Sequence, residues 1–455
     1  MVPLLIPAES QTRELDAKLL LACVAAERGF PVIVGSRIHM HRAIAHLPRG
    51  IYLAKDVRRP SRRMFRILGN LGHAIVACDE EGLVIITPEL YHRRRVDAAT
   101  LAMVELCLAW GRQSAELIRT APGYGGVEIA TVGNPRIDLL RPELRPLLEP
   151  EAQALRARFG DFVLVNTNFG RLNHFNPELS LTPSAPGEAC RRNLEPDDPP
   201  LEVWRYREAV MHAMTAMVPA LARALPRTRI VVRPHPSENH DRWRRAGEGF
   251  ANVAVTHEGP IASWLMAAAA VVHNGCTTGI EGRLLGRPVF ACHPTGVTGP
   301  GRDLPNRLSE EVHGLDELIG RLEATLAGSR APVPLTAAQA ALIGDYVVAL
   351  DGPLASDRIV DALVEFARRR DFPPPPLGGR IAGTFDATVR AFGKRLNALR
   401  SGHKDSADFT RQRFPGMDPA GANARIDRLR VLLGRFEGVA ARPVIGNVVR
   451  VERAR

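Results

Sequence analysis

Two stretches of this chain decide its fold: RIVVRPHPSE at residues 229–238 and AAAVVHNGCTTGIE at residues 268–281. Each is a short apolar run followed at once by polar residues, which is the pattern of a buried parallel strand that ends in a loop. The carboxyl ends of parallel strands meet at one edge of a sheet, and open α/β sheets bind ligands at that edge. We therefore expect the two loops to lie at the same edge of one sheet.

The residue types in these two loops favour an anionic ligand. A helix is expected over residues 277–285, and its first-turn N–H groups and its dipole attract negative charge. Arg233 offers a guanidinium fork, and His235, restrained between two prolines, offers an imidazole N–H. Glu281 is placed to accept hydrogen bonds from ribose hydroxyls, or alternatively to stabilise the helix start. The predicted phosphate- and nucleotide-binding residues are Arg233, His235, Ser237, Asn274, Thr277, Thr278 and Glu281.

The length of 455 residues exceeds that of one ordinary core, so two α/β domains with an extension are expected. Short apolar segments alternate with helical patterns, which indicates doubly wound parallel sheets. In the first half, strands are expected at residues 4–6, 31–34, 50–53, 74–78, 83–86, 106–109 and 128–132. A proline-rich stretch at 141–150 predicts a linker between Rossmann-like domains at 1–150 and 151–370. A helix at about 337–369 is expected to close the second domain.

The net charge of +11 is unevenly distributed along the chain. Residues 371–455, the predicted C-terminal extension, contain 16 Lys or Arg against 8 Asp or Glu. This surplus predicts contact with an anionic membrane surface, or else a solvated tail without a partner. Nucleic acid is not an expected partner, because aromatic residues make up only 5% of the chain. A helix at 385–399 carries an apolar stripe with Arg and Lys nearby, which suits either a membrane interface or packing on the protein's own surface.

Several other classes of protein are disfavoured by the sequence. The six cysteines have no C-x-x-C spacing, which indicates reduced thiols and neither disulfides nor a metal site. No apolar run reaches the roughly 18 to 20 residues of a membrane span, and the N-terminus lacks the basic segment of a signal peptide. We therefore expect a cytoplasmic protein, with the basic extension at the inner face of the membrane. The glycine patterns of dinucleotide-binding and P-loop proteins and the G-x-S-x-G elbow of hydrolases are absent.

Three consecutive carboxylates, Asp79, Glu80 and Glu81, follow the strand expected at 74–78. They raise one another's pKa unless a cation or a substrate lies among them. Such a cluster supplies a general acid, a base or a carboxylate nucleophile, unless it is only a solvated acidic turn. We take Glu81, Glu80 and Glu9, which follows the first strand, as candidate catalytic residues. The candidate cleft contacts are Asn134, Arg136, Asp138 and Asn168.

Taken together, these motifs resemble a family of bacterial surface-carbohydrate biosynthesis proteins. The shared landmarks are IPAE at 6–9, RELDAK at 13–18, DEEG at 79–82, WG at 110–111, GNPRID at 133–138, NTNF at 166–169, RPHP at 233–236 and HNGCTTGIE at 273–281. The likeness covers roughly residues 1–370, and RFPG at 413–416 is also similar. It implies a GT-B glycosyltransferase architecture, in which two Rossmann-like domains face a cleft.

More distantly, the chain is similar to the retaining Kdo transferases of capsule and O-antigen assembly. By that likeness Glu81 stands at the nucleophile position beside Glu80, although those enzymes commonly have Asp there. His235 then binds the phosphate of a CMP-linked donor, and residues 274–281 bind phosphate and ribose. The resemblance implies an EC 2.4 glycosyltransferase that moves Kdo or another ulosonic acid to a surface-polysaccharide or lipid-linked acceptor, with no metal or other cofactor. The alternatives are a CDP-glycerol-type polyol-phosphate transferase, a UDP-sugar 2-epimerase-like enzyme and a non-catalytic glycan- or nucleotide-binding scaffold.

Overall fold

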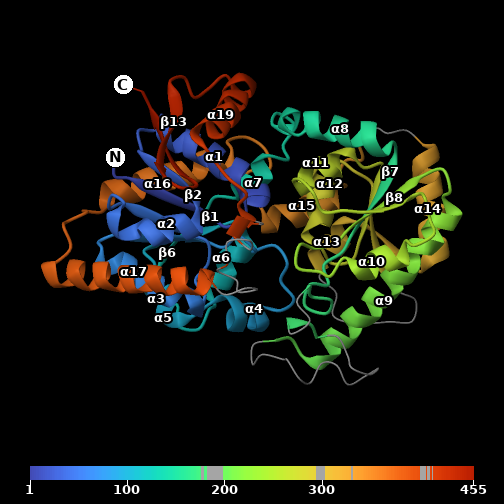
Figure 1. Cartoon of the computed structure of the whole chain (residues 1–455), viewed down its shortest axis with the longest axis horizontal. Helices are drawn as coiled ribbons and strands as arrows, with labels where there is room; N and C mark the ends of the chain where they lie inside the picture. Colours follow the sequence, from blue (N-terminus) through green and yellow to red (C-terminus); the bar gives the residue numbers. More distant parts are fainter. Residues whose placement is uncertain are drawn as a thin grey trace. The chain divides into compact units, whose positions relative to one another are not determined.

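The computed structural model describes residues 1–175, 179–181, 198–293, 303–328, 332–399, 406, 410–411 and 413–454. The chain folds into two compact units, which Figure 1 colours by sequence. Unit 1 comprises Met1–Gly82, Arg95–Leu147 and Gly344–Arg455, and unit 2 comprises Leu83–Arg94 and Leu148–Ile343. Residues 344–370, which the sequence placed in the second domain, therefore belong to the same unit as the N-terminus.

Unit 1 is built on an eight-stranded sheet in the order β13-β14-β2-β1-β3-β4-β5-β6. Its parallel part consists of β1 (Leu4–Ala8), β2 (Val32–Ser36), β3 (Ile51–Ala54), β4 (Ala74–Cys78), β5 (Leu106–Ala109) and β6 (Glu128–Thr131). The direction in which strands are added reverses between β1 and β3. Open α/β sheets bind ligands outside the carboxyl ends of the strands at such a switch point.

The strand expected at residues 83–86 does not form. Leu83 is buried and Val84 is half-buried in the turn and loop that follow β4, and no described strand pairs with them. An apolar run of this length indicates burial but does not by itself distinguish a strand from a buried loop. The prediction was therefore wrong at this element, while the other six expected strands of the first half are present.

The end of the chain forms a hairpin that the sequence analysis did not predict. β13 (Val439–Ile445) and β14 (Val448–Arg453) pair antiparallel, and β14 pairs antiparallel with β2. The connecting Gly446 has a φ of 49°, which suits glycine in the two-residue turn Gly446-Asn447. This Gly-Asn dipeptide between apolar residues was the signal that could have identified the hairpin.

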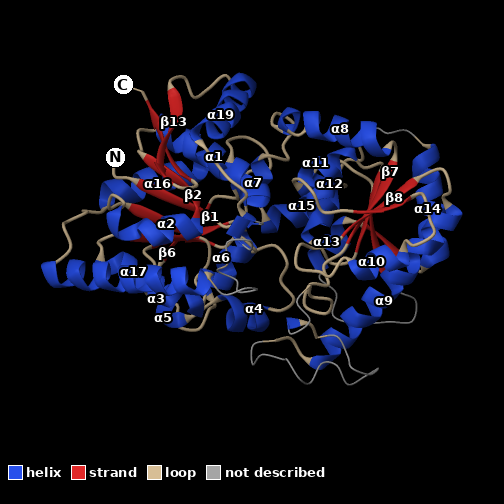
Figure 2. Cartoon of the chain, in the orientation of Figure 1, coloured by secondary structure: helices blue, strands red, loops and turns tan. Residues whose placement is uncertain are grey.

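Helices cover both faces of the sheet of unit 1 (Figure 2). α1 (Gln11–Glu27) contacts α7 (Pro135–Asp138), α16 (Ala355–Arg369) and α19 (Pro419–Leu433) on one face, and α17 (Leu377–Ala398) contacts α2 (Arg37–Ala43) and α3 (Arg62–Asn70) on the other. Unit 1 also contains α5 (Ala98–Leu101) and α6 (Arg112–Arg119), with single turns at Ile44–His46, Arg59–Ser61 and Arg145–Leu147, whereas α4 (Pro88–Arg95) belongs to unit 2 except for its last residue. The single helix expected at 337–369 is instead two, α15 (Ala337–Tyr346) and α16, because the chain turns at Ala349, where φ is 65°.

Unit 2 contains a six-stranded, fully parallel sheet in the order β12-β11-β10-β7-β8-β9. Its strands are β7 (Phe162–Asn166), β8 (Arg229–Arg233), β9 (Val253–Val255), β10 (Ala270–His273), β11 (Val289–His293) and β12 (Glu310–His313). β7 lies between β8 and β10, so the two polar loops do emerge at the same edge, as predicted. The order is that of the Rossmann sheet, and its switch point lies between β7 and β10.

Helices also cover both faces of the sheet of unit 2 (Figure 2). α9 (Leu201–Ala224) contacts α10 (Asp241–Ala246) and α14 (Leu315–Ala327), while α11 (Ile261–Ala267) contacts α8 (Glu149–Phe159) and α12 (Thr277–Leu284); α13 (Asp303–Leu308) lies beside α12. Two doubly wound α/β units with parallel sheets confirm the predicted fold class. Among the described residues, no helix combines the length and the apolar content needed to cross a lipid bilayer.

Candidate functional site

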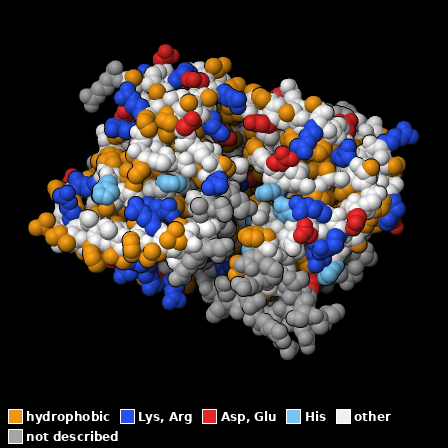
Figure 3. Space-filling model, in the orientation of Figure 1, with side chains coloured by type: hydrophobic (Ala, Val, Ile, Leu, Met, Phe, Trp, Pro, Cys, Tyr) orange, Lys and Arg blue, Asp and Glu red, His pale blue; other side chains and the backbone are white. Residues whose placement is uncertain are grey.

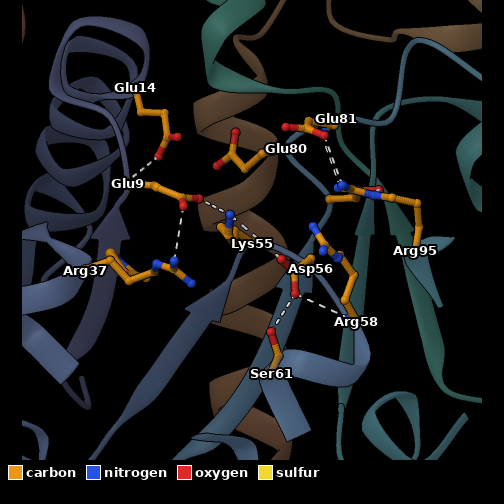
Figure 4. A network of polar contacts seen from close by, with 12 residues as sticks. Glu9, Glu14, Arg37, Lys55, Asp56, Arg58, Ser61, Glu80, Glu81 and Arg95 are labelled. Carbon is orange, nitrogen blue, oxygen red and sulfur yellow. Dashed lines mark hydrogen bonds and ion pairs between the residues drawn. The ribbon is translucent and has the colours of Figure 1, made fainter. Parts of the chain in front are cut away.

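The switch point of unit 1 holds a carboxylate surrounded by cations. Glu9 follows β1 and Lys55 follows β3, and the Lys55 ammonium contacts the Glu9 carboxylate (Figure 4). Arg37 Nη2 lies 3.1 Å and Arg413 Nη1 2.7 Å from Glu9 Oε1. Burial opposes ionisation of Glu9, but Arg37, Lys55 and Arg413 outweigh it and lower its pKa to about 2. Glu9 is therefore a firmly ionised carboxylate.

A buried lysine holds the second predicted catalytic residue in place. Lys18 Nζ lies 3.1 Å from Glu80 Oε1 and 3.1 Å from Glu14 Oε2, and it donates a hydrogen bond to the Pro7 carbonyl at 2.5 Å. Burial lowers the pKa of Lys18, but Glu80 and Glu14 more than compensate and raise it above its usual value. Glu14 Oε2 also accepts the Glu9 N–H at 2.9 Å. Lys18 thus fixes the Glu80 side chain against helix α1.

Arginine side chains neutralise the other two carboxylates of the acidic turn. Arg95 Nε lies 3.2 Å from Asp79 Oδ2, and Arg95 Nη1 lies 3.0 Å from Glu81 Oε2 (Figure 4). Arg13 Nη1 approaches Glu81 Oε1 at 3.6 Å. Burial raises the pKa of Glu81, but Arg95 and Arg13 lower it more, so the net shift is downward. The Glu81 side chain is 56% exposed and that of Glu80 15%, so Glu81 is the ionised carboxylate that a ligand reaches more easily.

The three residues expected as cleft contacts after β6 have different environments. Asn134 caps α7, since its Oδ1 accepts the Arg136 N–H at 2.9 Å. Arg136 Nη1 donates to the Glu80 carbonyl at 3.4 Å and so reaches the acidic turn. Asp138 is fully buried and accepts hydrogen bonds from the first two N–H groups of α16 at 2.8 and 2.9 Å, and from Ser356 Oγ at 2.8 Å. Burial raises its pKa to about 6. Asp138 anchors α16 instead of contacting a ligand.

In unit 2, the loop after β7 joins the two loops that were expected to meet. Asn168 Nδ2 lies 3.2 Å from the Gly275 carbonyl and 3.5 Å from that of Asn274, in the loop after β10. On the other side, a Cβ placed on Gly170 would lie 1.9 Å from Ser237 Oγ, in the loop after β8. The loops after β8 and β10 are therefore brought together through the loop after β7.

Glu238 links two of these loops, and this role was not predicted from the sequence. Its Oε1 accepts hydrogen bonds from Thr167 Oγ1 at 2.6 Å and from the N–H groups of Phe169 and His235, both at 3.0 Å. Its Oε2 accepts from Trp243 Nε1 at 3.0 Å. Burial raises the pKa of Glu238, although these four hydrogen bonds oppose the shift. No pattern of neighbouring residues in the sequence distinguishes this buried glutamate from a solvated one.

The start of α12 packs against a buried, neutral histidine. His273 Nδ1 accepts the Cys276 N–H at 3.3 Å, so the ring proton is on Nε2, which lies 2.8 Å from Ser309 Oγ. Ser309 Oγ donates in turn to the Pro305 carbonyl, which leaves it free to accept from His273. Burial lowers the pKa of His273 to about 3. A Cβ on Gly279 would lie 2.3 Å from His273 Nε2, so the helix reaches this position only with glycine there.

Two buried polar atoms at this switch point have no hydrogen-bond partner within the described structure. They are Asn166 Nδ2, at the end of β7, and Thr278 Oγ1, in the first turn of the helix that follows β10. An unpaired buried polar group costs about 1 to 3 kcal/mol. Such a cost is removed when an external acceptor binds there, so the two atoms mark a candidate ligand position.

The remaining predicted residues of unit 2 differ in how far they are available to a ligand. Arg233 donates to the Glu258 and Gly259 carbonyls at 2.7 and 2.6 Å, and burial lowers its pKa to about 10. Its fork is therefore occupied by backbone carbonyls, in contrast to the expected phosphate contact. His235 is exposed, and its Nδ1 lies 2.8 Å from Ser237 Oγ. Asn274 Nδ2 donates to the Cys292 carbonyl at 2.9 Å. Of the other two residues predicted in this loop and helix, Thr277 is half-buried and Glu281 is buried.

No protein-family model matches this chain, and no curated protein matches its sequence. Among solved structures, it is similar to the UDP-GlcNAc 2-epimerase from Neisseria meningitidis bound to UDP-GlcNAc, with a TM-score of 0.48 and 12% identity over 80% of this chain and 100% of that one. It is also similar to a UDP-N-acetylglucosamine 2-epimerase from Listeria monocytogenes (TM-score 0.47, 13% identity, 82% and 99% covered) and to the wall teichoic acid polymerase TagF (0.47, 11%, 80% and 88%). These TM-scores lie below 0.5, and the two doubly wound units are defined by the strand order of this chain itself.

Proposed function

We propose that this protein is a glycosyltransferase that uses a nucleotide-linked sugar. The observation that carries the proposal is the pair of unsatisfied buried donors, Asn166 Nδ2 and Thr278 Oγ1, at the switch point of unit 2. An amide N–H and a hydroxyl beside a helix start suit a phosphate oxygen, because the helix dipole and both donors favour negative charge. His273 is neutral there, so it adds no positive charge, and the proposed phosphate contacts are the two neutral donors and the helix start.

The proposed catalytic carboxylate is Glu81 of unit 1. It is ionised and exposed, and Arg95 and Arg13 hold its oxygens, as a carboxylate nucleophile requires. In the proposed reaction Glu81 bonds to the anomeric carbon while the bond from that carbon to the phosphate oxygen breaks, and the nucleotide leaves with the electron pair. An acceptor hydroxyl then displaces Glu81 and loses its proton to solvent. Glu9, with a pKa of about 2, holds no proton to donate at neutral pH, so its proposed role is to keep Lys55 and Arg37 in position.

The proposed donor is CMP-linked Kdo or another ulosonic acid, and the proposed acceptor is a surface-polysaccharide or lipid-linked glycan. The support for this narrower assignment is the resemblance carried by Glu80-Glu81-Gly82 and by His235 between its two prolines. The wild-type protein is incubated with CMP-Kdo, UDP-GlcNAc and CDP-glycerol, and release of each nucleotide is measured. We expect release from CMP-Kdo alone. Turnover of either of the others would replace the CMP assignment, and turnover of none would favour a non-catalytic scaffold.

Nucleotide binding is tested separately with Thr278→Val. The substitution preserves the shape of the side chain and removes a hydroxyl that has no partner, so the melting temperature of the free protein should not fall. Affinity for CMP, measured by calorimetry, should drop about tenfold for one lost hydrogen bond to phosphate. Thr215→Val is the matched control, because the Thr215 hydroxyl already donates to Met211 within α9. Equal CMP affinity in both variants would remove α12 from the phosphate site.

The catalytic role is tested with Glu81→Gln. The amide cannot act as a nucleophile, so turnover should fall by about a hundredfold or more while CMP affinity stays unchanged. The control is Glu116→Gln, which changes another exposed glutamate of the same unit that pairs only with Arg119 among the ion pairs described. Retained turnover in Glu81→Gln would exclude Glu81 as the nucleophile even if CMP still binds.

A further inference from the structure

Helix α17 packs on unit 1 through a face of small residues. Gly383, Ala387 and Ala391 are buried where the helix contacts α2 and α3. A Cβ on Gly383 would lie 2.9 Å from Asn70 Cβ, so the two helices approach closely at this point. The protein's own surface therefore occupies the small face of α17, and the apolar stripe noted in the sequence does not make this contact.

That apolar stripe is exposed on the other side of the helix. Seven large apolar side chains recur at intervals of three or four residues, and each is between 44% and 83% exposed: Leu377, Ile381, Phe385, Val389, Phe392, Leu396 and Leu399. Half of the fourteen exposed large apolar side chains of the described residues lie at 377–399. Figure 3 shows hydrophobic side chains in a row where Figure 1 places α17. An apolar row of this length on one helix marks an interaction surface, whereas single exposed apolar residues do not.

The surroundings of the stripe are basic. α17 contains four Lys or Arg (Arg380, Arg390, Lys394 and Arg395) but only one acidic residue, Asp386. The adjacent helix α3 adds two exposed arginines, Arg63 and Arg66. Figure 3 shows Lys and Arg side chains beside the apolar row. An apolar stripe flanked by cations is the pattern of a helix that lies in the interface of an anionic bilayer.

We propose that α17 docks unit 1 on an anionic lipid surface. The helix lies in the plane of the membrane, with its apolar stripe among the acyl chains and the flanking cations at the lipid headgroups. A second copy of the chain suits this surface less well. A two-fold interface brings the same patch of both copies together, and the cations around the two stripes would then repel one another. This inference is independent of the proposed function.

The test is flotation of the full-length protein with vesicles of phosphatidylcholine and phosphatidylglycerol, compared with phosphatidylcholine alone. The wild type should float with the anionic vesicles, and added salt should weaken its binding. Phe385→Ser/Phe392→Ser/Leu396→Ser should lower the partition coefficient by about a hundredfold, since three apolar side chains no longer enter the bilayer. The matched control is Val431→Ser/Val444→Ser/Ile445→Ser, which changes three exposed apolar residues elsewhere in unit 1 and should bind as the wild type does.

A second variant reports insertion directly. The chain has four tryptophans, and all are buried: Trp110, Trp204, Trp243 and Trp264. Phe392→Trp therefore introduces a fifth tryptophan, at an exposed position. Its emission should shift to the blue with anionic vesicles. The proposal is overturned if the α17 triple variant floats as well as its control, or if the wild type does not float and the Phe392→Trp emission does not shift. It is equally overturned if the wild type is instead a dimer that the triple variant makes monomeric.

Discussion

The carboxyl edges of the two parallel sheets both gather polar loops at a switch point, but their electrostatics differ. In unit 1 the loops after the strands carry carboxylates, and each is compensated by Lys or Arg: Glu9 by Lys55, Glu80 by Lys18 and Glu81 by Arg95. In unit 2 the end of β7 and the loop after β10 carry amides, hydroxyls and a neutral His273, two of the buried polar atoms there lack a partner within the described structure, and the Glu238 carboxylate after β8 is held by uncharged donors. The strand order of a sheet determines where its polar loops come together. The side chains of those loops determine which kind of ligand can bind there.

Two glutamates show this difference most directly. Glu9 and Glu238 both lie in loops at the carboxyl edge of a sheet, yet their pKa values shift in opposite directions. Cations outweigh burial at Glu9 and lower its pKa to about 2. At Glu238 burial outweighs four hydrogen bonds from uncharged donors and raises the pKa. At Glu238 the four neutral donors do not offset burial, whereas at Glu9 the nearby cations do.

The largest effect is expected from Lys18→Met, which removes the buried cation of unit 1. Glu14 and Glu80 would lose their shared partner at a site where little water reaches them. Breaking a buried ion pair in this way costs about 3 to 5 kcal/mol. The free energy of unfolding, measured with urea, should fall by this amount.

Glu238→Gln provides the comparison for unit 2. The remaining carbonyl oxygen can still accept from Thr167, Phe169 and His235, while the new amide group loses only the hydrogen bond from Trp243. This change should cost about 1 to 2 kcal/mol. Arg28→Met, which removes an exposed ion pair with Asp361 next to α1, should have little effect. If Glu238→Gln lowered the free energy of unfolding more than Lys18→Met does, the proposed electrostatic difference between the two edges would be contradicted.

The next effect concerns pH and the Glu9 site. Because the pKa of Glu9 in the folded protein is about 2, below the ordinary value of 4.5, the native state favours the ionised form. The resulting stability, about 3 kcal/mol, is fully present above pH 4.5 and is lost as the pH falls towards 2. Glu9→Gln should therefore be less stable than the wild type at neutral pH, and the two unfolding free energies should converge near pH 2. A difference that does not change with pH would show that Glu9 acts through packing and not through its charge.

The sequence predicted the positions of the polar loops well, because strand ends depend on local apolar runs. The runs at 229–232 and 270–272 are followed by polar residues, and β8 and β10 end at the first of these, Arg233 and His273. The acidic turn at Asp79-Glu80-Glu81 was likewise identified as a site that needs cations. The identity of those cations was not predictable, since Lys18 and Arg13 come from a distant helix and no local spacing relates them to the turn.

The same limit explains the residues whose environment differed from expectation. Arg233 has the residue type and position expected of a residue that binds phosphate, but its guanidinium group donates hydrogen bonds to two carbonyls of the loop after β9. Asp138 has the type of a cleft residue, but its partner Ser356 is more than two hundred residues away in the sequence. Burial and long-range hydrogen bonds decide these roles. By contrast, the Gly446-Asn447 turn was a local signal for the C-terminal hairpin and was missed.

The last prediction tests how closely α12 packs at the carboxyl edge of unit 2. In Gly279→Ala the new methyl group would meet the His273 ring at 2.3 Å, so the helix must move, at a cost of about 1 to 3 kcal/mol. Gly320→Ala is the control, because a Cβ there meets nothing within 4 Å on an exposed part of α14, and the higher helix propensity of alanine should add about 0.5 to 1 kcal/mol. Urea unfolding should thus give changes of opposite sign for the same substitution in the same unit. If both variants were stabilised, α12 would not pack closely against His273. The position of the helix start, and with it the unpaired Thr278 hydroxyl, would then differ from that in the structure.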